Sequence, residues 1–232
     1  MALWEYLWAW SWTTQWLYHL NWNATDDSWN WNNLTPNNIS WVWGKIWSWS
    51  ASFNWSSSYL THPTLLDNWL SSWTISFWFK TTWTSGARLI SKEWPSGNPY
   101  IFIISINTYA RPWQVILSNS WGIFGANVVE STCTNCNDWE RHNVVCTWNS
   151  SGRDSLKIYI DWEEGYNLLG DTWWDTWSIL ADTTKDIFIW KRYNNSNYLD
   201  WEIDEIIIEE WNWTAEEVKK YYTYQKGLFW IL

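Results

Sequence analysis

Tryptophan is the residue that most constrains this chain. The 232 residues include 31 tryptophans and only 9 glycines, whereas glycine usually makes up about 7% of a protein and tryptophan far less. Trp22, Trp139 and Trp162 each stand between two polar residues at an expected bend. A tight turn favours a residue that tolerates positive φ, and Asn-Gly and Asp-Gly are the strongest short hairpin signals. Similar polar surroundings recur at Trp29, Trp31, Trp55 and Trp201. The pattern indicates that many of these tryptophans stand where a turn needs glycine.

Recoding of a stop codon explains such a pattern. Some genetic codes read UGA as glycine, and a translation table that reads UGA as tryptophan would then print tryptophan at each such codon. The alternative is a genuinely tryptophan-rich sugar-binding protein, whose indole rings stack on pyranose faces. That alternative predicts tryptophans on strand faces or in one groove, so the turn positions favour UGA recoding. The recoding hypothesis predicts that the turn tryptophans are exposed and that several have positive φ.

A few tryptophans are expected to be genuine, because they lie in apolar surroundings. Strands welcome aromatic residues, and a tryptophan before a helix can pack against the first turn. Such positions are Trp73, Trp78, Trp148 and Trp213.

Length and charge limit the class of protein. The chain fits one large all-β domain or two small ones, and without a Pro/Ser-rich linker we expect one, over residues 16–226, with a lead-in at 1–15 and a tail at 227–232. A net charge of −10 and a pI near 4.6 argue against nucleic acid or an anionic membrane surface as partner. The sequence contains no run of 18 apolar residues, so it predicts no membrane-spanning helix. The N-terminal stretch has no basic region and carries Glu5, so no signal peptide is evident.

The distribution of apolar residues predicts many short strands. Turn residues interrupt the apolar or alternating runs about every 8 to 12 residues, which is typical of a β-sandwich or barrel. Thr214 and Glu217 form a capping-box pattern, with Trp213 and Val218 placed as a hydrophobic staple, and predict one helix over 214–225. The predicted strands are 17–20, 50–53, 59–60, 73–80, 87–91, 100–106, 114–118, 142–148, 155–160, 186–191 and 201–209.

Several strings of residues follow the order of a known family once the turn tryptophans are taken as glycine. They lie at 16–33, 44–60, 74–80, 141–144, 156–162, 189–192, 199–206 and 214–218. Over residues 16–222 the chain resembles laminin-G-like, concanavalin-A-like lectin/glucanase domains. The resemblance implies an all-β jelly-roll sandwich of two antiparallel sheets with one short C-terminal helix and adjacent termini.

The same resemblance suggests a calcium site. The loop around Asp26 and Asp27 is rich in the hard oxygen donors that Ca²⁺ prefers. Relatives of this fold often hold a structural calcium between this loop, a backbone carbonyl and an aspartate of the last long strand. The matching ligands are Asp26 or Asp27, the carbonyl of Trp55, and Asp204. The alternative is that these polar side chains only cap turns by bonding their own backbone, and both interpretations stay open.

The segment 202–206 invites comparison with an enzyme. Laminarinase-type hydrolases of this fold use Glu-x-Asp-x-Glu, in which the two-residue period of a strand points three carboxylates into one cleft. Here Glu202 and Asp204 match, but the third position is Ile206. Retaining hydrolysis therefore lacks one of its two carboxylates, and the sequence predicts that the protein is not an enzyme.

The three cysteines do not form an even disulfide set. With His142 they resemble a zinc knuckle, although the spacing deviates in two intervals and a strand at 142–148 would separate the ligands. A local disulfide or free thiols are therefore favoured over zinc, and one consistent pairing joins Cys146 to Cys133 or Cys136.

These observations favour a non-catalytic recognition module on a cell surface or a virion. It would bind a glycan or a surface protein at a loop rim, with Ca²⁺ as a structural cofactor. Two other functions stay open, a glycoside hydrolase and a ligand-free structural spacer. Paired carboxylates about 5 Å apart in a cleft would favour the hydrolase.

Overall fold

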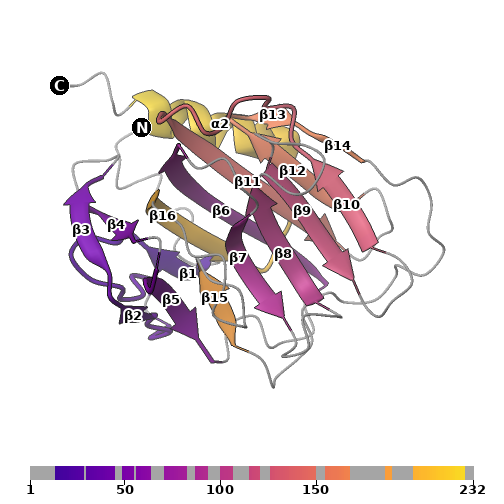
Figure 1. Ribbon diagram of the computed structural model, residues 1–232. Coiled ribbons are helices and arrows are strands. Elements are labelled where there is room, and N and C mark those ends of the chain that lie inside the picture. Colours follow the sequence, from indigo (N-terminus) through magenta and orange to yellow (C-terminus); the bar gives the residue numbers. More distant parts are fainter. Residues whose placement is uncertain are drawn as a thin grey trace.

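The computed structural model is a sandwich of two antiparallel sheets with one C-terminal helix (Figure 1). This is the predicted all-β jelly-roll class, and every described strand pair is antiparallel. The structure describes residues 14–28, 30–44, 49–54, 56–63, 71–82, 87–93, 100–106, 115–120, 126–149, 155–167, 186–189 and 201–227.

The first sheet has the helix against its outer face, as Figure 1 shows. Its strands, in spatial order, are β13 (Glu163–Glu164), β12 (Lys157–Ile160), β11 (Arg141–Asn149), β6 (Ser72–Thr81), β16 (Trp201–Glu209), β4 (Trp49–Phe53) and β3 (Ser40–Trp43), and β1 (Thr14–Tyr18) also pairs with β16.

The second sheet closes the sandwich from the other side. Its spatial order is β14 (Tyr166–Asn167), β10 (Ala126–Glu130), β9 (Val115–Ser120), β8 (Tyr100–Ile106), β7 (Ala87–Glu93), β15 (Ile187–Ile189), β5 (Tyr59–His62) and β2 (Thr35–Asn37).

Strand β6 shows how the sequence builds two layers of packing. Alternate residues of a strand point to opposite faces, and β6 places Trp73 and Phe77 in the core between the sheets. Trp78 points to the other face, where it stacks on Tyr222 of the helix α2 (Ala215–Gly227) with ring centroids 5.8 Å apart. Because both faces are covered, almost the whole strand is buried.

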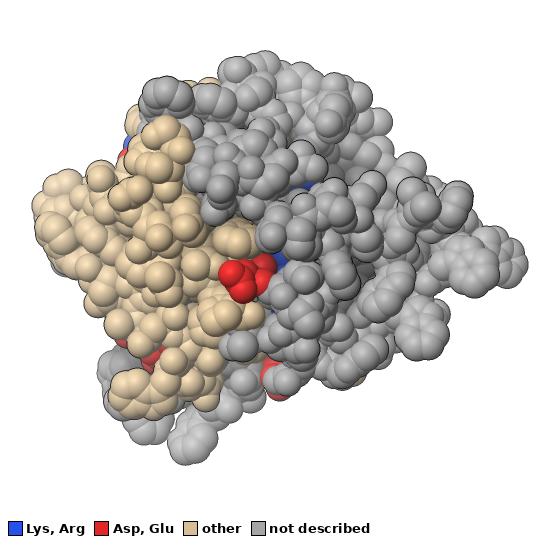
Figure 2. Space-filling view, turned by 60° about the horizontal axis from the view of Figure 1, so that its bottom comes forward, with Lys and Arg blue, Asp and Glu red and all other residues tan. Residues whose placement is uncertain are grey.

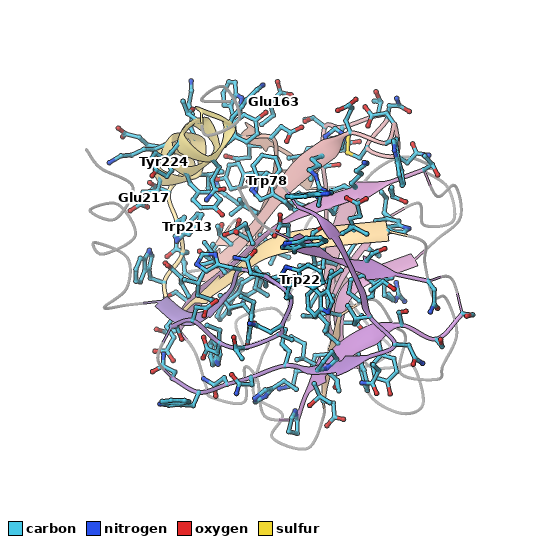
Figure 3. The ribbon with its side chains drawn as sticks, turned by 90° about the vertical axis from the view of Figure 1, so that its left-hand side faces the viewer. Trp22, Trp78, Glu163, Trp213, Glu217 and Tyr224 are labelled. Carbon is cyan, nitrogen blue, oxygen red and sulfur yellow. A yellow bond between two sulfur atoms is a disulfide. The ribbon has the colours of Figure 1, made fainter. Side chains whose placement is uncertain are left out.

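The helix begins where the sequence predicts it. The backbone N–H of Thr214 donates to Glu217 Oε2 at 2.7 Å, and the N–H of Glu217 donates to Thr214 Oγ1 at 3.3 Å. This reciprocal pair is a capping box, and it satisfies backbone donors that a helix start leaves open. Trp213 and Val218 pack in the same cluster between helix and sheet, and Figure 3 shows Trp213 and Trp78 beneath the helix.

Strand β16 contains a bulge that the sequence does not reveal. Its pairing with β6 shifts register between Asp204 and Ile207, and Glu205 has a φ of 51°. A bulge adds one residue and reverses the alternation that follows it. Ile203 and Ile206 consequently both face the core between the sheets. The expectation that Ile206 shares a face with Glu202 and Asp204 is therefore wrong.

The turn tryptophans behave largely as glycine-like positions. Trp22, Trp31, Trp139 and Trp162 have φ values of 63°, 62°, 70° and 73°, and all are exposed. The predicted combination of exposure and positive φ is thus confirmed at these turns. Trp201 is an exception, because it is buried in the core of the sandwich and lies on a strand rather than in a turn. Trp29 and Trp55 lie outside the described residues.

The tryptophans expected to be genuine are buried. Trp73, Trp78 and Trp213 are at most 1% exposed, and Trp148 is 4% exposed. Among the described residues, no helix is long and apolar enough to cross a bilayer. The predicted adjacency of the termini concerns residues outside the described ranges.

Candidate functional site: a pocket between the helix and the first sheet

A pocket of about 560 Å³ opens between the C-terminal half of α2, strand β6 and the loops near β11. We call it the helix-side pocket. Its lining combines aromatic rings with side chains of both charges: Trp78, Lys80, Asp138, Trp139, Glu140, Arg141, His142, Asp161, Tyr222 and Lys226. Pockets that bind small ligands usually combine an apolar wall with a few placed polar groups, and this one has both.

Arg141 is the central cation of the pocket. Its guanidinium bonds to Glu202, and it donates to the carbonyl of Trp43 at 2.7 Å. Lys80 lies 3.8 Å from the same carboxylate. The second terminal nitrogen of Arg141, Nη1, is buried and makes no hydrogen bond to any described residue. A buried donor without a hydrogen-bond partner has a high energetic cost.

His142 lies between two carboxylates at the edge of the pocket. Its Nδ1 is 2.7 Å from Asp161 and its Nε2 is 3.1 Å from Asp138. Burial by itself lowers the pKa of His142, but hydrogen bonds and charges from Asp161 and Asp138 outweigh it and raise the pKa above its usual value. Asp161 also accepts the backbone N–H of Asn143 at 2.9 Å, which fixes the turn that presents it.

The aromatic side of the pocket comes from the helix and from β6. Tyr222 stacks on Trp78, and Lys226 lies 5.4 Å from the centre of the Tyr222 ring. Ring faces next to charged hydrogen-bonding groups suit sugar rings, which present apolar faces and polar edges, and they also suit polar protein side chains.

A second pocket lies among the N-terminal loops. It has a volume of about 480 Å³ and a mainly apolar lining with four uncharged polar residues: Trp22, Asn23, Ala24, Thr25, Asn33, Leu34, Pro36, Asn38, Ile39 and Trp41. It contains no charged side chain, so it offers fewer specific contacts than the helix-side pocket.

The predicted calcium ligand Asp26 organises its own loop. Its carboxylate accepts the backbone N–H groups of Leu17 at 3.1 Å, Ser28 at 2.9 Å and Asn32 at 3.0 Å. These bonds are the ones that the turn-capping interpretation describes.

The other two predicted acidic ligands lie around His19. Its Nδ1 is 2.8 Å from Glu205, and Asp27 and Asp204 add to its electrostatic environment. Burial by itself lowers the pKa of His19, but Glu205, with Asp27 and Asp204, outweighs it and raises the pKa to about 9. The imidazolium therefore neutralises part of this acidic region near neutral pH.

The structure does not gather the predicted calcium ligands into one cluster of described side chains. Asp204 is fully buried and accepts the backbone N–H of Glu205 at 3.0 Å. Within the described ranges, Asp26, Asp27 and Asp204 do not form a set of three neighbouring ligands. The carbonyl of Trp55 lies outside the described residues.

The predicted local disulfide is present, but its pairing differs from the one named above. Cys133 and Cys136 form the disulfide, and Cys146 is a buried free thiol. Cys146 lies in the middle of β11, opposite Ile75 and Ile158 of the neighbouring strands, whereas the other two cysteines are three residues apart in the loop before that strand.

The carboxylates of the hydrolase pattern are engaged in other contacts. Glu202 is paired with Arg141 and Lys80, Asp204 is fully buried, and Ile206 lies in the core. The two matched carboxylates are thus held by structural partners.

Sequence reasoning missed the helix-side pocket, because its walls come from segments far apart in the chain. Lys80, Arg141 and Tyr222 belong to three different elements. One available signal was the group of charged residues around Trp139 that directly precedes a strand, since polar groups at strand ends often form sites.

Comparisons with known proteins show the fold. No protein-family model matches the chain, and no curated protein sequence matches it. Solved structures do match, including the binding domain of botulinum neurotoxin serotype D/C, at 12% identity and a TM-score of 0.68 over 93% of this chain and 53% of that domain. The botulinum neurotoxin DC binding domain in complex with rat synaptotagmin II matches at 12% identity and a TM-score of 0.67, over 93% of this chain and 52% of that one.

A further match is the same toxin's binding domain in complex with SialylT, at 12% identity and a TM-score of 0.68, over 93% of this chain and 52% of the other. The chain therefore spans about half the length of these receptor-binding domains. At this identity the likeness concerns the fold alone.

Proposed function

We propose that the protein is a non-catalytic recognition module that binds a glycan or a surface protein. The observation that carries the proposal is the helix-side pocket, whose lining combines the Tyr222 ring with charged side chains such as Lys80 and Lys226. Sugar and protein ligands both use such combinations of ring faces and fixed polar groups. Glu202 is paired with Arg141, and Asp204 is fully buried. These positions support a binding role over hydrolysis.

The structural neighbours support the same proposal. They are binding domains, and their titles name a protein partner, synaptotagmin, and a glycan-related ligand, SialylT. The net charge of −10 argues against a nucleic-acid partner. On the face shown in Figure 2 the described surface is mainly uncharged, with acidic side chains gathered near its middle. We place the module outside the cell, on a cell surface or a virion.

A glycan array followed by calorimetry on any hit tests this function. Lys226→Ala and Tyr222→Ala remove one charge and one ring from the pocket, and each should weaken binding about tenfold, which corresponds to about 1.4 kcal/mol. Glu216→Gln, on the exposed part of the same helix, is the matched control and should bind as the parent does. Equal binding by all three variants would place the ligand elsewhere, and a blank array together with a blank screen of surface proteins would favour a structural spacer.

We further propose a structural calcium ion bound by Asp26 or Asp27, the carbonyl of Trp55, and Asp204. The support is that Asp27, Asp204 and Glu205 each raise the pKa of His19 through their negative charge. Asp204→Ala should lower the melting temperature in Ca²⁺ but not in EDTA. An equal drop in both solutions would rule out the ligand role.

We also propose that many turn tryptophans are glycine in the natural product, through UGA recoding. The support is the positive φ of Trp22, Trp31, Trp139 and Trp162, a conformation that glycine adopts without steric cost. UGA codons at these positions and UGG at Trp78 are the expected finding in the gene. UGG at all of them, or a natural product whose mass includes every printed tryptophan, would end the hypothesis.

A further inference from the structure

The loop before β11 brings two cysteines and a histidine together. The ligand atoms of Cys133, Cys136 and His142 all lie within 4.8 Å of one another. Cys136 is fully buried and the other two are partly buried. Within the described ranges this is the one place where three potential metal-ligating side chains meet. We call it the Cys–His cluster.

We propose that the Cys–His cluster binds one Zn²⁺ when its disulfide is reduced. Thiolate sulfur and imidazole nitrogen are the ligands that zinc prefers, at about 2.3 and 2.0 Å from the metal. In a tetrahedral site with those bond lengths, neighbouring ligand atoms are separated by about 3.3 to 3.8 Å. The ligand atoms lie within 4.8 Å of one another, and after reduction the two sulfurs, now 2.05 Å apart, must separate to reach that range.

The histidine is held as zinc-bound histidines usually are. A zinc-ligating imidazole normally donates its other ring N–H to a carboxylate, which fixes the ring and its tautomer. His142 Nδ1 lies 2.7 Å from Asp161, which leaves Nε2 for the metal. Asp138 Oδ1 lies 3.1 Å from that Nε2, and this contact opens when the metal binds there. The geometry thus gives Cys133, Cys136 and His142 as protein ligands and Asp161 as the residue that positions the ring, with water in the fourth position.

This three-residue set differs from the zinc knuckle that the cysteine spacing resembles. In that pattern Cys146 would be the fourth ligand, but it lies in the core on β11, four residues and about 13 Å along the strand from His142. The prediction against a knuckle with Cys146 and the proposal of a site without it are therefore compatible.

The disulfide and the metal exclude each other, because both use the same sulfur atoms. A phosphine reductant supplies two electrons to the Cys133–Cys136 bond and takes an oxygen atom from water, and the two protons of that water end on the two sulfurs. Zn²⁺ then displaces the two thiol protons to solvent and binds the thiolates. In a cell a dithiol would supply the electrons and become a disulfide. The cluster consequently couples zinc binding to the redox state of its surroundings.

Cobalt titration of the full-length chain tests the proposal. After reduction by a phosphine without oxygen, Co²⁺ should produce a sulfur-to-cobalt charge-transfer band and the intense visible bands of a four-coordinate site, saturating at one ion per chain. Zn²⁺ should abolish them by displacement, and the oxidised protein should show none. Reduced protein without these bands, or equal bands in Cys133→Ser and Cys136→Ser, would overturn the proposal.

Two further variants separate the site from a general effect on folding. Cys146→Ser removes the remaining thiol and should leave the cobalt spectrum unchanged. If this variant lost the cobalt bands, Cys146 would be a ligand and the assigned set would be wrong. Asp161→Asn should keep the charge-transfer band while weakening the affinity about 10- to 100-fold, as changes behind a ligating histidine do. An unchanged affinity would remove Asp161 from the proposal.

A measurement on the unmutated protein guards against variants that fail to fold. Zn²⁺ should slow alkylation of Cys133 and Cys136 in the reduced chain, as read by mass spectrometry of the peptides. Cys146 is buried, and its reactivity should be low with or without the metal. Alkylation of the two loop cysteines at the same rate with and without Zn²⁺ would refute the site.

Discussion

Replacing Trp31 by glycine and by alanine isolates the backbone requirement at a turn. Trp31 is 82% exposed and has a φ of 62°, so removing its ring sacrifices little buried surface. Alanine retains the steric cost of left-handed backbone, about 1 to 2 kcal/mol. Glycine removes that steric cost, but it makes the unfolded chain more flexible, which lowers the stability of the folded protein by about 0.5 to 1 kcal/mol. Trp31→Gly should therefore be about 0.5 to 1 kcal/mol more stable than Trp31→Ala.

Trp43 provides the matched control. It is also exposed, at 75%, but it lies in strand β3 and its φ is not positive. Both Trp43→Gly and Trp43→Ala lose the stacking on Trp49, so their difference reports the backbone alone. There glycine should be about 0.5 to 1 kcal/mol less stable than alanine.

Chemical denaturation of the four variants measures both differences. In thermal unfolding each kcal/mol should move the melting temperature by about 2 to 4 °C for a chain of this size. The expected signature is a change of sign between the two positions. A Trp31→Gly variant that is no more stable than Trp31→Ala would refute the argument that the turn demands glycine, and with it the main structural support for recoding.

Two further predictions concern charge and capping. The pKa of His19 is raised from 6.5 to about 9. At 1.36 kcal/mol per pKa unit, this shift contributes up to about 3 kcal/mol to the free energy of unfolding. The contribution is complete below about pH 6.5 and disappears as the pH rises through 9. Urea unfolding of His19→Gln should accordingly show a flatter pH dependence over that interval than the parent, and parallel curves would contradict the assignment. Thr214→Ala removes the hydroxyl of the capping box and should cost about 1 kcal/mol, measured in the same way, whereas Thr223→Ala on the exposed helix surface should cost less.

Much of the fold could be predicted, because the long strands carry their pattern locally. Strand β8 occupies the predicted range, and β6, β11 and β16 agree within two residues. The helix could be predicted because Thr214 and Glu217, which form its capping box, are only three residues apart in the sequence. Strands β2, β3 and β10 were missed because their short sequences have no strong alternation, and pairing with neighbours determines their conformation.

The candidate sites were harder to predict for a different reason. The helix-side pocket depends on which face Lys80 and Arg141 occupy and on where α2 packs, and these are properties of the tertiary structure. The bulge at Glu205 also reversed the alternation on which the hydrolase argument relied. The cysteine spacing, in contrast, did indicate a local disulfide, and the structure joins Cys133 to Cys136.

The residues with positive φ show where the backbone of the described ranges is strained. Eight non-glycine residues of the described ranges have positive φ: Leu20, Trp22, Trp31, Asn38, Trp139, Asp161, Trp162 and Glu205. Asn and Asp tolerate this conformation, and with the four tryptophans taken as glycine only Leu20 and Glu205 remain strained. Leu20 follows His19 in the chain, and Glu205 bonds to it. The two remaining strained residues therefore lie next to His19, one as its chain neighbour and one as its hydrogen-bond partner.

Glu205→Gly tests whether the bond to His19 maintains that strain. Glycine removes the left-handed cost of about 1 to 2 kcal/mol, but the variant loses the partner of a charged imidazole. Near pH 6, where His19 is protonated, the loss should dominate and the variant should be less stable than the parent. Above pH 9, where His19 is neutral, the relief of strain and the removal of a buried carboxylate should make it equally or more stable. Urea unfolding at the two pH values measures both effects, and a variant that is more stable at both would show that Glu205 is held by the sheet pairing alone.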